Sequence, residues 1–275
     1  GTLTAYTTPQ LLGGNSNMVL ATLIYQRAMS VSDWTGASVI ALIMILKRKM
    51  ITVTKTDFIP QKEAMGQIAR IGIPIALQDG LIQVAFIVIT IIANRRGLSD
   101  AAAVGIVEKI ISILFLVPSS MMSTISALVA QNIGAGKHDR AKLTLKYVLM
   151  ITVTYGLIMT IIVQFVSVPL VGLFTNDGAV AVSGAGYLLS YASDCIFAGI
   201  HFCLSGYFYA YGLSVISFIH NSISIVCARI PLSYYASVHF KDTLFPMGCA
   251  APAGSLISVV ICVGVFIWLE HHEDK

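Results

Sequence analysis

Long apolar runs dominate the chain from residue 71 onward, and short polar stretches separate them. A helix needs about 20 predominantly apolar residues to cross roughly 30 Å of hydrocarbon. Six segments satisfy this requirement: residues 71–93, 101–130, 147–174, 180–210, 213–236 and 248–269. The runs are longer than barrel strands and lack strict alternation, so the pattern predicts an all-α, polytopic membrane helical bundle.

The first quarter of the chain has a weaker pattern. The apolar run of residues 18–46 is interrupted by "QRAMSVSDW", which contains Arg27 and Asp33. This run is either one broken span or an interfacial helix followed by half a span. We therefore divide the chain into a partial helix with a cytoplasmic linker, residues 1–64, and a six-helix lobe, residues 65–275.

Composition supports the membrane assignment. Of the 275 residues, 56% are hydrophobic and 11% are charged, whereas soluble domains carry about 25% charged residues. The five cysteines lie in apolar segments without CxxC spacing, which predicts small buried side chains rather than a disulfide framework or a metal site. Neither a resident cofactor nor a nucleic-acid partner is expected, and membrane lipids surround the spans.

Basic residues gather on one set of connections between the runs. Those that decide the orientation are Lys47, Arg48, Lys49, Lys55, Lys62, Arg70, Lys137, Arg140, Lys142 and Lys146. Two spans separate the two groups, so both lie on the same side, and the positive-inside rule makes that side cytoplasmic. A multi-pass protein of the plasma (inner) membrane follows, with the last span leaving "EHHEDK" in the cytoplasm.

The stretch "AQNIGAGKHDRAK", residues 130–142, differs from a phosphate-binding loop. Such a loop reads GxxxxGK[ST] after a strand, whereas this stretch joins two predicted spans. We expect Gly134 and Gly136 to lie in a short non-helical turn, with Asp139 near the start of the next helix. With no catalytic constellation in the sequence, the prediction is that the chain is not an enzyme.

Ionisable residues inside spans are costly, so each one is a candidate for function. The strongest is Asp194, which shares a helix face with the residues Tyr187, Tyr191, Ala198, His201 and Ser205. An acid on a face lined by hydroxyls and an imidazole can bind a proton or Na⁺. The alternative is a structural acid that hydrogen-bonds a neighbouring helix, and His201 by itself is more typical of a packed polar residue.

A second group of polar residues lies in the first predicted span. Asp79 and Gln83 share a face, Gln78 is adjacent, and Pro74 precedes Asp79 by about one turn. Either a functional role or a contact between helices fits Asp79.

Two further positions offer a choice between packing and function. Pro118 predicts a kink, and the nearby Met121 fits either an adaptable pocket or core packing. Arg229, just before Pro231, is expected to pair with an acid or with helix-end carbonyls, as a structural residue.

Five stretches, in order, resemble the carboxy-terminal half of multidrug and toxic compound extrusion (MATE) transporters. They are "IARIGIPIALQDGLIQV", "AAAVGIVEKIISILFLVPSSMMSTISALVAQNIGAGKHDRAK", "LFTND", "GYLLSYASDCIFAGIHFCLSGYF" and "ARIPLSYY". The resemblance implies two six-helix lobes around a cavity, with Na⁺ or H⁺ moving in as an organic, often cationic, compound moves out.

The resemblance also implies residue roles. Asp194, Asp79 and Tyr191 would bind the cation, and the substrate cavity would include Gln78, Gln83, Met121, Tyr187 and His201. The sequence departs from the family where its usual acids fall at Ala198 and near Ile82. The first five helices are missing, so the chain is expected to be truncated and to need an amino-terminal lobe or a second copy. Alternatives are a lipid-linked or polysaccharide flippase, or a nonfunctional lobe that needs a partner.

Overall fold

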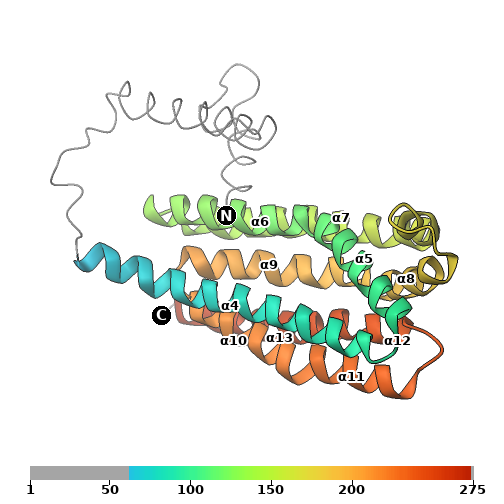
Figure 1. Cartoon of the computed structure of the whole chain (residues 1–275). Coiled ribbons are helices and arrows are strands. Elements are labelled where there is room, and N and C mark those ends of the chain that lie inside the picture. The colour runs from blue at the N-terminus through green and yellow to red at the C-terminus, as the bar shows by residue number, and fades with distance from the viewer. Residues whose placement is uncertain (1–61, 274–275) are drawn as a thin grey trace, which may run out of the picture. The chain divides into compact units, whose positions relative to one another are not determined.

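The computed structural model describes residues 62–273, and all the secondary structure in this range is helical (Figure 1). The chain divides into two compact units, Gly1–Ala69 and Arg70–Lys275. Most of the predicted region 1–64 lies outside the described residues, so that domain boundary stays a prediction. The elements are α4 (Lys62–Asn94), α5 (Leu98–Leu114), α6 (Leu116–Gly134), α7 (His138–Gly172), α8 (Gly178–Tyr191), α9 (Asp194–Ala210), α10 (Ser214–Ser224), η3 (Ile225–Arg229), α11 (Ile230–His239), α12 (Phe245–Gly248) and α13 (Ala250–Glu273).

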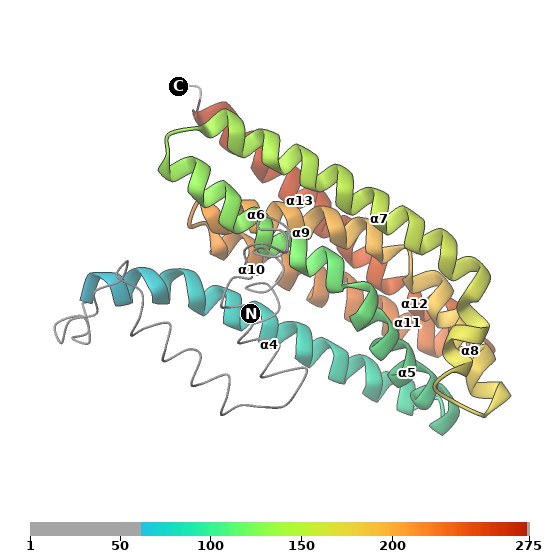
Figure 2. The ribbon, with the colours of Figure 1, turned by 90° about the horizontal axis from the view of Figure 1, so that it is seen from above.

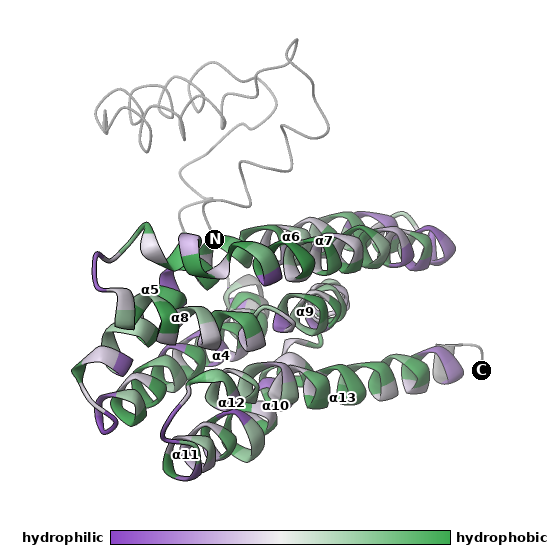
Figure 3. Ribbon diagram, turned by 90° about the vertical axis from the view of Figure 1, so that its right-hand side faces the viewer, coloured by the Kyte–Doolittle hydropathy of each residue, from purple (hydrophilic) through white to green (hydrophobic). Residues whose placement is uncertain are grey.

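The predicted spans are confirmed for five segments outright and for the sixth as a bent pair of helices. Five helical segments are long and apolar enough to cross a membrane, and the pair α8 and α9, bent by 45°, makes a sixth if it is counted as one span. The five are Ile68–Asn94, Leu98–Gly134, His138–Gly172, Ser214–His239 and Phe245–His271. Polar residues concentrate at the helix ends and connections, with apolar residues along the middles (Figure 3). The chain is therefore a multi-pass membrane protein.

A proline accounts for the break between α5 and α6. Pro118 has no N–H to donate to the carbonyl of Leu114, four residues earlier. The Tyr155 hydroxyl on α7 donates to that carbonyl instead, at 3.0 Å. The predicted kink is present, and it lies at Phe115, one turn before the proline. Here a neighbouring helix satisfies the backbone group that the proline leaves open, as the hydrocarbon requires.

The same device recurs at Pro74 inside α4. Its missing N–H leaves the carbonyl of Arg70 open. The hydroxyl of Ser214, the first residue of α10, donates to that oxygen at 3.4 Å. The proline therefore marks a place where α4 and α10 are joined by a polar contact.

The break between α8 and α9 corrects a sequence prediction. We expected Tyr187 to Ser205 to follow one helix face, but the helix ends at Tyr191 and restarts at Asp194. At the break the Ala192 carbonyl accepts from the Cys195 N–H at 3.1 Å, and the Thr160 hydroxyl on α7 lies 3.0 Å from the same oxygen. One of the stabilising contacts therefore comes from another helix, and the local sequence did not indicate the break.

Helix α9 lies between the pair α6 and α7 on one side and α13 on the other (Figure 1). Glycines permit the closest approaches. A Cβ on Gly206 would overlap the Met122 carbonyl oxygen and Ile125 of α6. A Cβ on Gly156 of α7 would lie 2.8 Å from the Cys195 carbonyl oxygen. Small residues let backbones in a membrane approach in this way, which makes α9 the centre of a tightly packed frame.

The α6–α7 connection differs in one detail from its prediction. Gly136 takes the left-handed backbone conformation, with φ of 70°. Gly134 is the last residue of α6, so only Gly136 belongs to the non-helical turn. Asp139 occupies the first turn of α7 as expected. Lys142 forms an ion pair with Glu270 at 3.2 Å, and the end of α13 lies near this turn (Figure 2), in agreement with the predicted shared side of the membrane.

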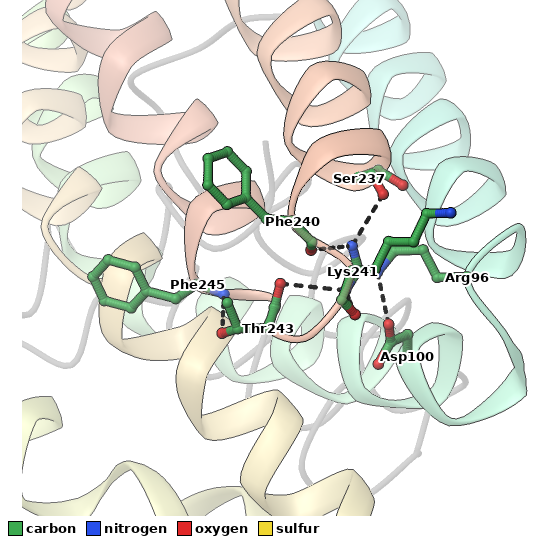
Figure 4. A network of polar contacts seen from close by, with 7 residues as sticks. All are labelled: Arg96, Asp100, Ser237, Phe240, Lys241, Thr243 and Phe245. Carbon is green, nitrogen blue, oxygen red and sulfur yellow. Dashed lines mark hydrogen bonds and ion pairs between the residues drawn. The ribbon is translucent and has the colours of Figure 1, made fainter.

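A polar clamp closes the opposite end of the bundle. It centres on Arg96, at the α4–α5 corner, whose side chain is 6% exposed (Figure 4). Its Nε donates to Asp100 at 2.7 Å. The two terminal nitrogens donate to four backbone carbonyls at 2.7–3.2 Å, which belong to Ser237, Phe240, Lys241 and Thr243. All five guanidinium N–H groups therefore have acceptors, and the clamp joins the α4–α5 corner to the α11–α12 connection.

Free cysteines are found at all five positions. Cys195, Cys203 and Cys262 are buried as predicted, but Cys227 and Cys249 are exposed. The apolar sequence around the latter two indicated burial because it cannot distinguish a helix face in the core from one on the outside of a membrane bundle.

A candidate ligand cavity between the helices

A cavity of about 260 Å³ lies among α4, α5, α6, α8, α9, α10, η3 and α13. Its aromatic lining comes from Phe86, Phe115, Tyr191 and Phe202. The other polar residues in its wall are Ser112, Ser119, Asp194, His201, Asn221, Ser224, Arg229 and Ser255. An apolar wall with a few convergent polar groups is typical of a site for a small organic molecule.

Asp194 is the first residue of α9, directly after the break in the span. The residue is 1% exposed, and its Oδ1 atom has no hydrogen-bond partner. Ser255 of α13 interacts with the same carboxyl group. A buried carboxylate is costly without a compensating charge. The position therefore suits an acid that holds a proton or a small cation.

His201 lies two turns further along α9 and is 4% exposed. Its ring packs edge-on against His220 of α10, with ring centroids 5.6 Å apart. Ser205 and the Nε2 atom of His220 form a hydrogen bond of 3.0 Å, but the Nδ1 atoms of both histidines lack partners. An imidazole with an open ring nitrogen therefore lines the cavity on the same helix as Asp194.

Arg229 contributes a positively charged group to the cavity wall, in contrast to the carboxyl group of Asp194. Its terminal nitrogen donates to the Tyr191 hydroxyl, and its guanidinium carbon lies 5.1 Å from the Phe86 ring centroid and 5.4 Å from that of Tyr191. Its Nε atom has no hydrogen-bond partner. The sequence led us to expect an acid or helix-end carbonyls as its partner. In the described part of the chain no carboxylate lies within ion-pair distance of Arg229, although Glu108 of α5 interacts with it electrostatically from further away.

The structure brings together some of the residues that the sequence singled out. Tyr191, Asp194 and His201 line the cavity. Tyr187 packs behind them, with its ring centroid 5.8 Å from that of Tyr191. Their assignment to cation binding or to the substrate cavity stays a prediction, although their proximity is now a structural fact.

Other predicted residues lie elsewhere. Asp79 is exposed on α4, and Gln78 is buried and accepts a hydrogen bond from the Tyr209 hydroxyl at 3.2 Å. Gln83 lines a neighbouring hollow of about 310 Å³ that also contains Glu108. Met121 packs against an apolar cluster that includes Ile125. The lobe therefore gathers its candidate groups around α9 rather than along α4.

Sequence reasoning interpreted Arg229 as a structural residue and did not single out Asn221 or Ser255. The signal for Arg229 was present, because an arginine within a span is costly and needs a reason. Its proximity to a proline favoured a structural interpretation instead. Asn221 and Ser255 come from different helices, and only the packing of α10 and α13 around α9 brings them to the same cavity.

Comparison with known proteins gives a consistent result. The MatE family model matches residues 74–235, which is more than half of the chain. A FAD transporter of Shewanella oneidensis is 26% identical over 84% of this chain and 51% of its own length. The probable multidrug resistance protein YoeA of Bacillus subtilis is 21% identical over 75% of this chain and 45% of its own length.

Solved structures show the same fold. A multidrug resistance MATE family transporter in an outward-facing conformation matches with a TM-score of 0.80 and 15% identity, over 93% of this chain and 56% of its own. A MOP superfamily transporter from Pyrococcus furiosus matches with a TM-score of 0.75 and 17% identity, over 92% of this chain and 55% of its own.

The chain spans about half the length of the curated relatives it matches, which fits the predicted six-helix lobe. Transporters of this family are not enzymes. The matched family model and the shared fold together establish that the chain belongs to the MatE family.

Proposed function

We propose that this lobe takes part in cation-coupled antiport, in which small organic compounds leave the cell across the plasma membrane as Na⁺ or H⁺ enters. The observation that carries this proposal is the unpartnered carboxylate oxygen of Asp194, buried in a cavity between spans. The relatives named as a FAD transporter and as multidrug proteins support an organic cargo.

Coupling follows from the electrostatics of Asp194. Its ionised form is costly in this cavity unless a proton or a cation is bound. Tyr191 and His201 line the same space and offer oxygen and nitrogen atoms to a bound ion. A cation that binds one arrangement of the helices more tightly than another shifts the balance between them. The acid therefore links ion binding to the change in conformation.

A second lobe, or a second copy of this chain, is the partner that we propose for a complete transport path. Helix α4 exposes large apolar side chains such as Leu77, Val84 and Ile87, and the relatives are about twice as long as the chain. On this proposal the chain alone does not export compounds at the rate of a two-lobe transporter. Proteoliposomes containing the chain alone test this, with chemical cross-linking to detect paired copies. Efflux at full rate from uncross-linked single copies would contradict it.

The flippase alternative has less support, because the named relatives are a FAD transporter and multidrug proteins rather than carriers of lipid-linked sugars.

Ion binding to Asp194 can be tested without a complete transport path. A ligand that binds only the folded chain raises its melting temperature. We expect NaCl, compared with choline chloride at equal ionic strength, or a lower pH, to stabilise the wild-type chain and to have much less effect on Asp194→Asn. The matched control is Asp139→Asn, an exposed acid in the first turn of α7. Equal cation-dependent shifts in the wild type and Asp194→Asn would overturn the assignment, and Asp79→Asn would then be measured next.

A further inference from the structure

We propose that Arg229 is the anion-recognition group of this cavity, and that the compound bound here carries a carboxylate or phosphate on a flat ring. The inference rests on the proposed transport function, because it concerns the same cavity. It changes the expected cargo from an organic cation to an organic anion.

The first argument is the incomplete pairing of Arg229. A guanidinium group has five N–H donors in a planar fork, which matches the two oxygens of a carboxylate or phosphate. In this cavity the group has a neutral partner, the Tyr191 hydroxyl, and its Nε atom has none. Arg229 is half-buried with its Nε atom covered, and among the described residues its carboxylate neighbour, Glu108, lies beyond ion-pair distance, so the charge is incompletely balanced. An anionic group of a ligand would supply both the missing charge and the missing acceptor.

The second argument is the aromatic wall beside the cation. The Phe86 and Tyr191 rings both lie close to the Arg229 guanidinium. Phe115 continues this wall, with its ring edge-on to Tyr191 at a centroid distance of 6.4 Å, and it contacts Phe202 in the same way at 6.1 Å. Aromatic surfaces of this kind bind flat apolar rings. The cavity therefore offers a surface for a ring next to a donor for its acidic substituent.

The third argument is the backbone that carries Arg229. Residues Ile225–Arg229 form a turn of π-helix, and the Ile230 N–H donates to the carbonyl of Ile225 five residues earlier. Single π-turns inside α-helices are uncommon and occur frequently at functional sites. Gly254 of α13 lies against this segment, because a Cβ there would lie 2.9 Å from the Ser224 hydroxyl and 3.5 Å from the Cβ of Arg229. An irregular helical turn and a close contact with Gly254 therefore occur at the position from which Arg229 reaches the cavity wall.

The test uses two probes that share a naphthalene ring and differ in charge, 2-naphthoate and 2-naphthylmethylammonium. Binding to the purified 275-residue chain in neutral detergent is measured by equilibrium dialysis against protein-free micelles. Charge-assisted hydrogen bonds contribute about 1.5–3 kcal/mol, which is roughly a 10- to 100-fold difference in affinity. We expect the wild type to bind 2-naphthoate at least about tenfold more tightly than the cation. Equal binding, or a preference for the cation, would overturn the proposal without any variant.

Variants then assign the preference to Arg229. Arg229→Gln is expected to lose about tenfold or more in 2-naphthoate affinity with little change for the cation. Arg229→Lys keeps the charge without the fork, so its affinity should lie between the two. Arg95→Gln removes an exposed arginine outside this cavity and is the matched control. Size-exclusion chromatography shows whether each variant is folded. Unchanged binding to folded Arg229→Gln would overturn the assignment.

Asp194→Asn separates this inference from the proposed function. We expect the Asp194→Asn chain to lose its cation-dependent stabilisation and to bind 2-naphthoate at least as tightly as the wild type, because the substitution removes a negative charge from the wall of the same cavity. If the wild type shows no cation-dependent stabilisation but binds 2-naphthoate through Arg229, the coupling proposal fails and the anion site stands. If stabilisation depends on Asp194 but anion binding does not depend on Arg229, the coupling proposal stands and the anion site fails.

Discussion

Arg96 and Arg229 carry the same guanidinium group, and the protein surrounds the two in opposite ways. Every N–H group of Arg96 has an acceptor, supplied by Asp100 and four backbone carbonyls. Arg229 donates to one hydroxyl and leaves its Nε atom without a partner beside a cavity. A guanidinium group whose N–H donors all have acceptors in the protein needs no ligand. One with a donor left over can gain an acceptor from a ligand. Hydrogen-bond saturation, rather than residue type, therefore separates the structural arginine from the candidate binding arginine.

The acids show the same division. Asp100 pairs with Arg96 at 2.7 Å and is partly exposed at the end of the bundle. Asp194 is fully buried between spans, and one of its oxygens has no partner. The polar groups around Arg96 at one end of the lobe have partners, whereas Asp194 and Arg229 inside it each have an atom without one. We therefore expect stability and binding to depend on different residues.

The largest predicted effect is on Arg96. Arg96→Gln removes most of the donors to four backbone carbonyls and Asp100. The bonds to Asp100 and to the Ser237 carbonyl are partly buried, whereas those to Phe240, Lys241 and Thr243 are exposed, so water replaces part of what is lost. A hydrogen bond to a charged group contributes about 1.5–3 kcal/mol. We expect the free energy of unfolding to fall by about 3 kcal/mol, measured by thermal melting in detergent. Arg229→Gln should change it by less than about 1 kcal/mol, since it removes a half-buried charge that forms no ion pair with any described residue. Equal losses in the two variants would contradict the comparison.

A second prediction compares the stability that comes from close packing of α6 against α9 with the stability that comes from the Arg96 clamp. In Gly206→Ala the new Cβ would overlap the Met122 carbonyl oxygen and the Ile125 side chain. Overpacking of this kind costs about 1–3 kcal/mol. Gly105→Ala on α5 is the control, because its Cβ would meet nothing within 4 Å. Melting temperatures of the two variants should differ clearly, and a stable Gly206→Ala chain would mean that α6 and α9 can separate at little cost.

The sequence predicted the spans well, because the thickness of the bilayer sets their length and a run of consecutive apolar residues shows it directly. It also predicted the break near Pro118, which has a local chemical cause. It missed the break after Tyr191, where one of the two donors to the Ala192 carbonyl, Thr160, comes from another helix. The site was predicted in part for the same reason. Asp194 and His201 share one helix, whereas Arg229 and Ser255 reach the cavity only through packing.

A third prediction compares the two acids. Asp100→Asn weakens a charge-assisted hydrogen bond to Arg96, so we expect a loss of about 1 kcal/mol in the free energy of unfolding. Asp194→Asn removes a charge that no described residue pairs with, so stability should stay equal or rise slightly when the coupling cation is absent. Thermal melting in choline chloride measures both. A larger loss for Asp194→Asn than for Asp100→Asn would show that Asp194 is a packing acid.

The smallest predicted effect on stability concerns the exposed ion pair between Lys142 and Glu270, at the other end of the bundle from Arg96. Lys142 and Glu270 approach to 3.2 Å, but their side chains are 32% and 40% exposed. Exposed pairs of this kind contribute about 0.2–1 kcal/mol, because water and salt screen the charges. A double-mutant cycle with Lys142→Ala and Glu270→Ala isolates the coupling between the two residues from their other contacts. We expect a coupling energy below about 1 kcal/mol that decreases as NaCl is raised.

The contact between Lys142 and Glu270 also bears on membrane topology, whatever its strength, since it requires the α6–α7 turn and the end of α13 to lie on the same side of the membrane. Reagents that label cysteines from one side only should therefore reach Lys142→Cys and Glu270→Cys from the same face, in a background whose own five cysteines are replaced by serine or alanine. Labelling from opposite faces would contradict this packing even if the measured coupling were as small as predicted.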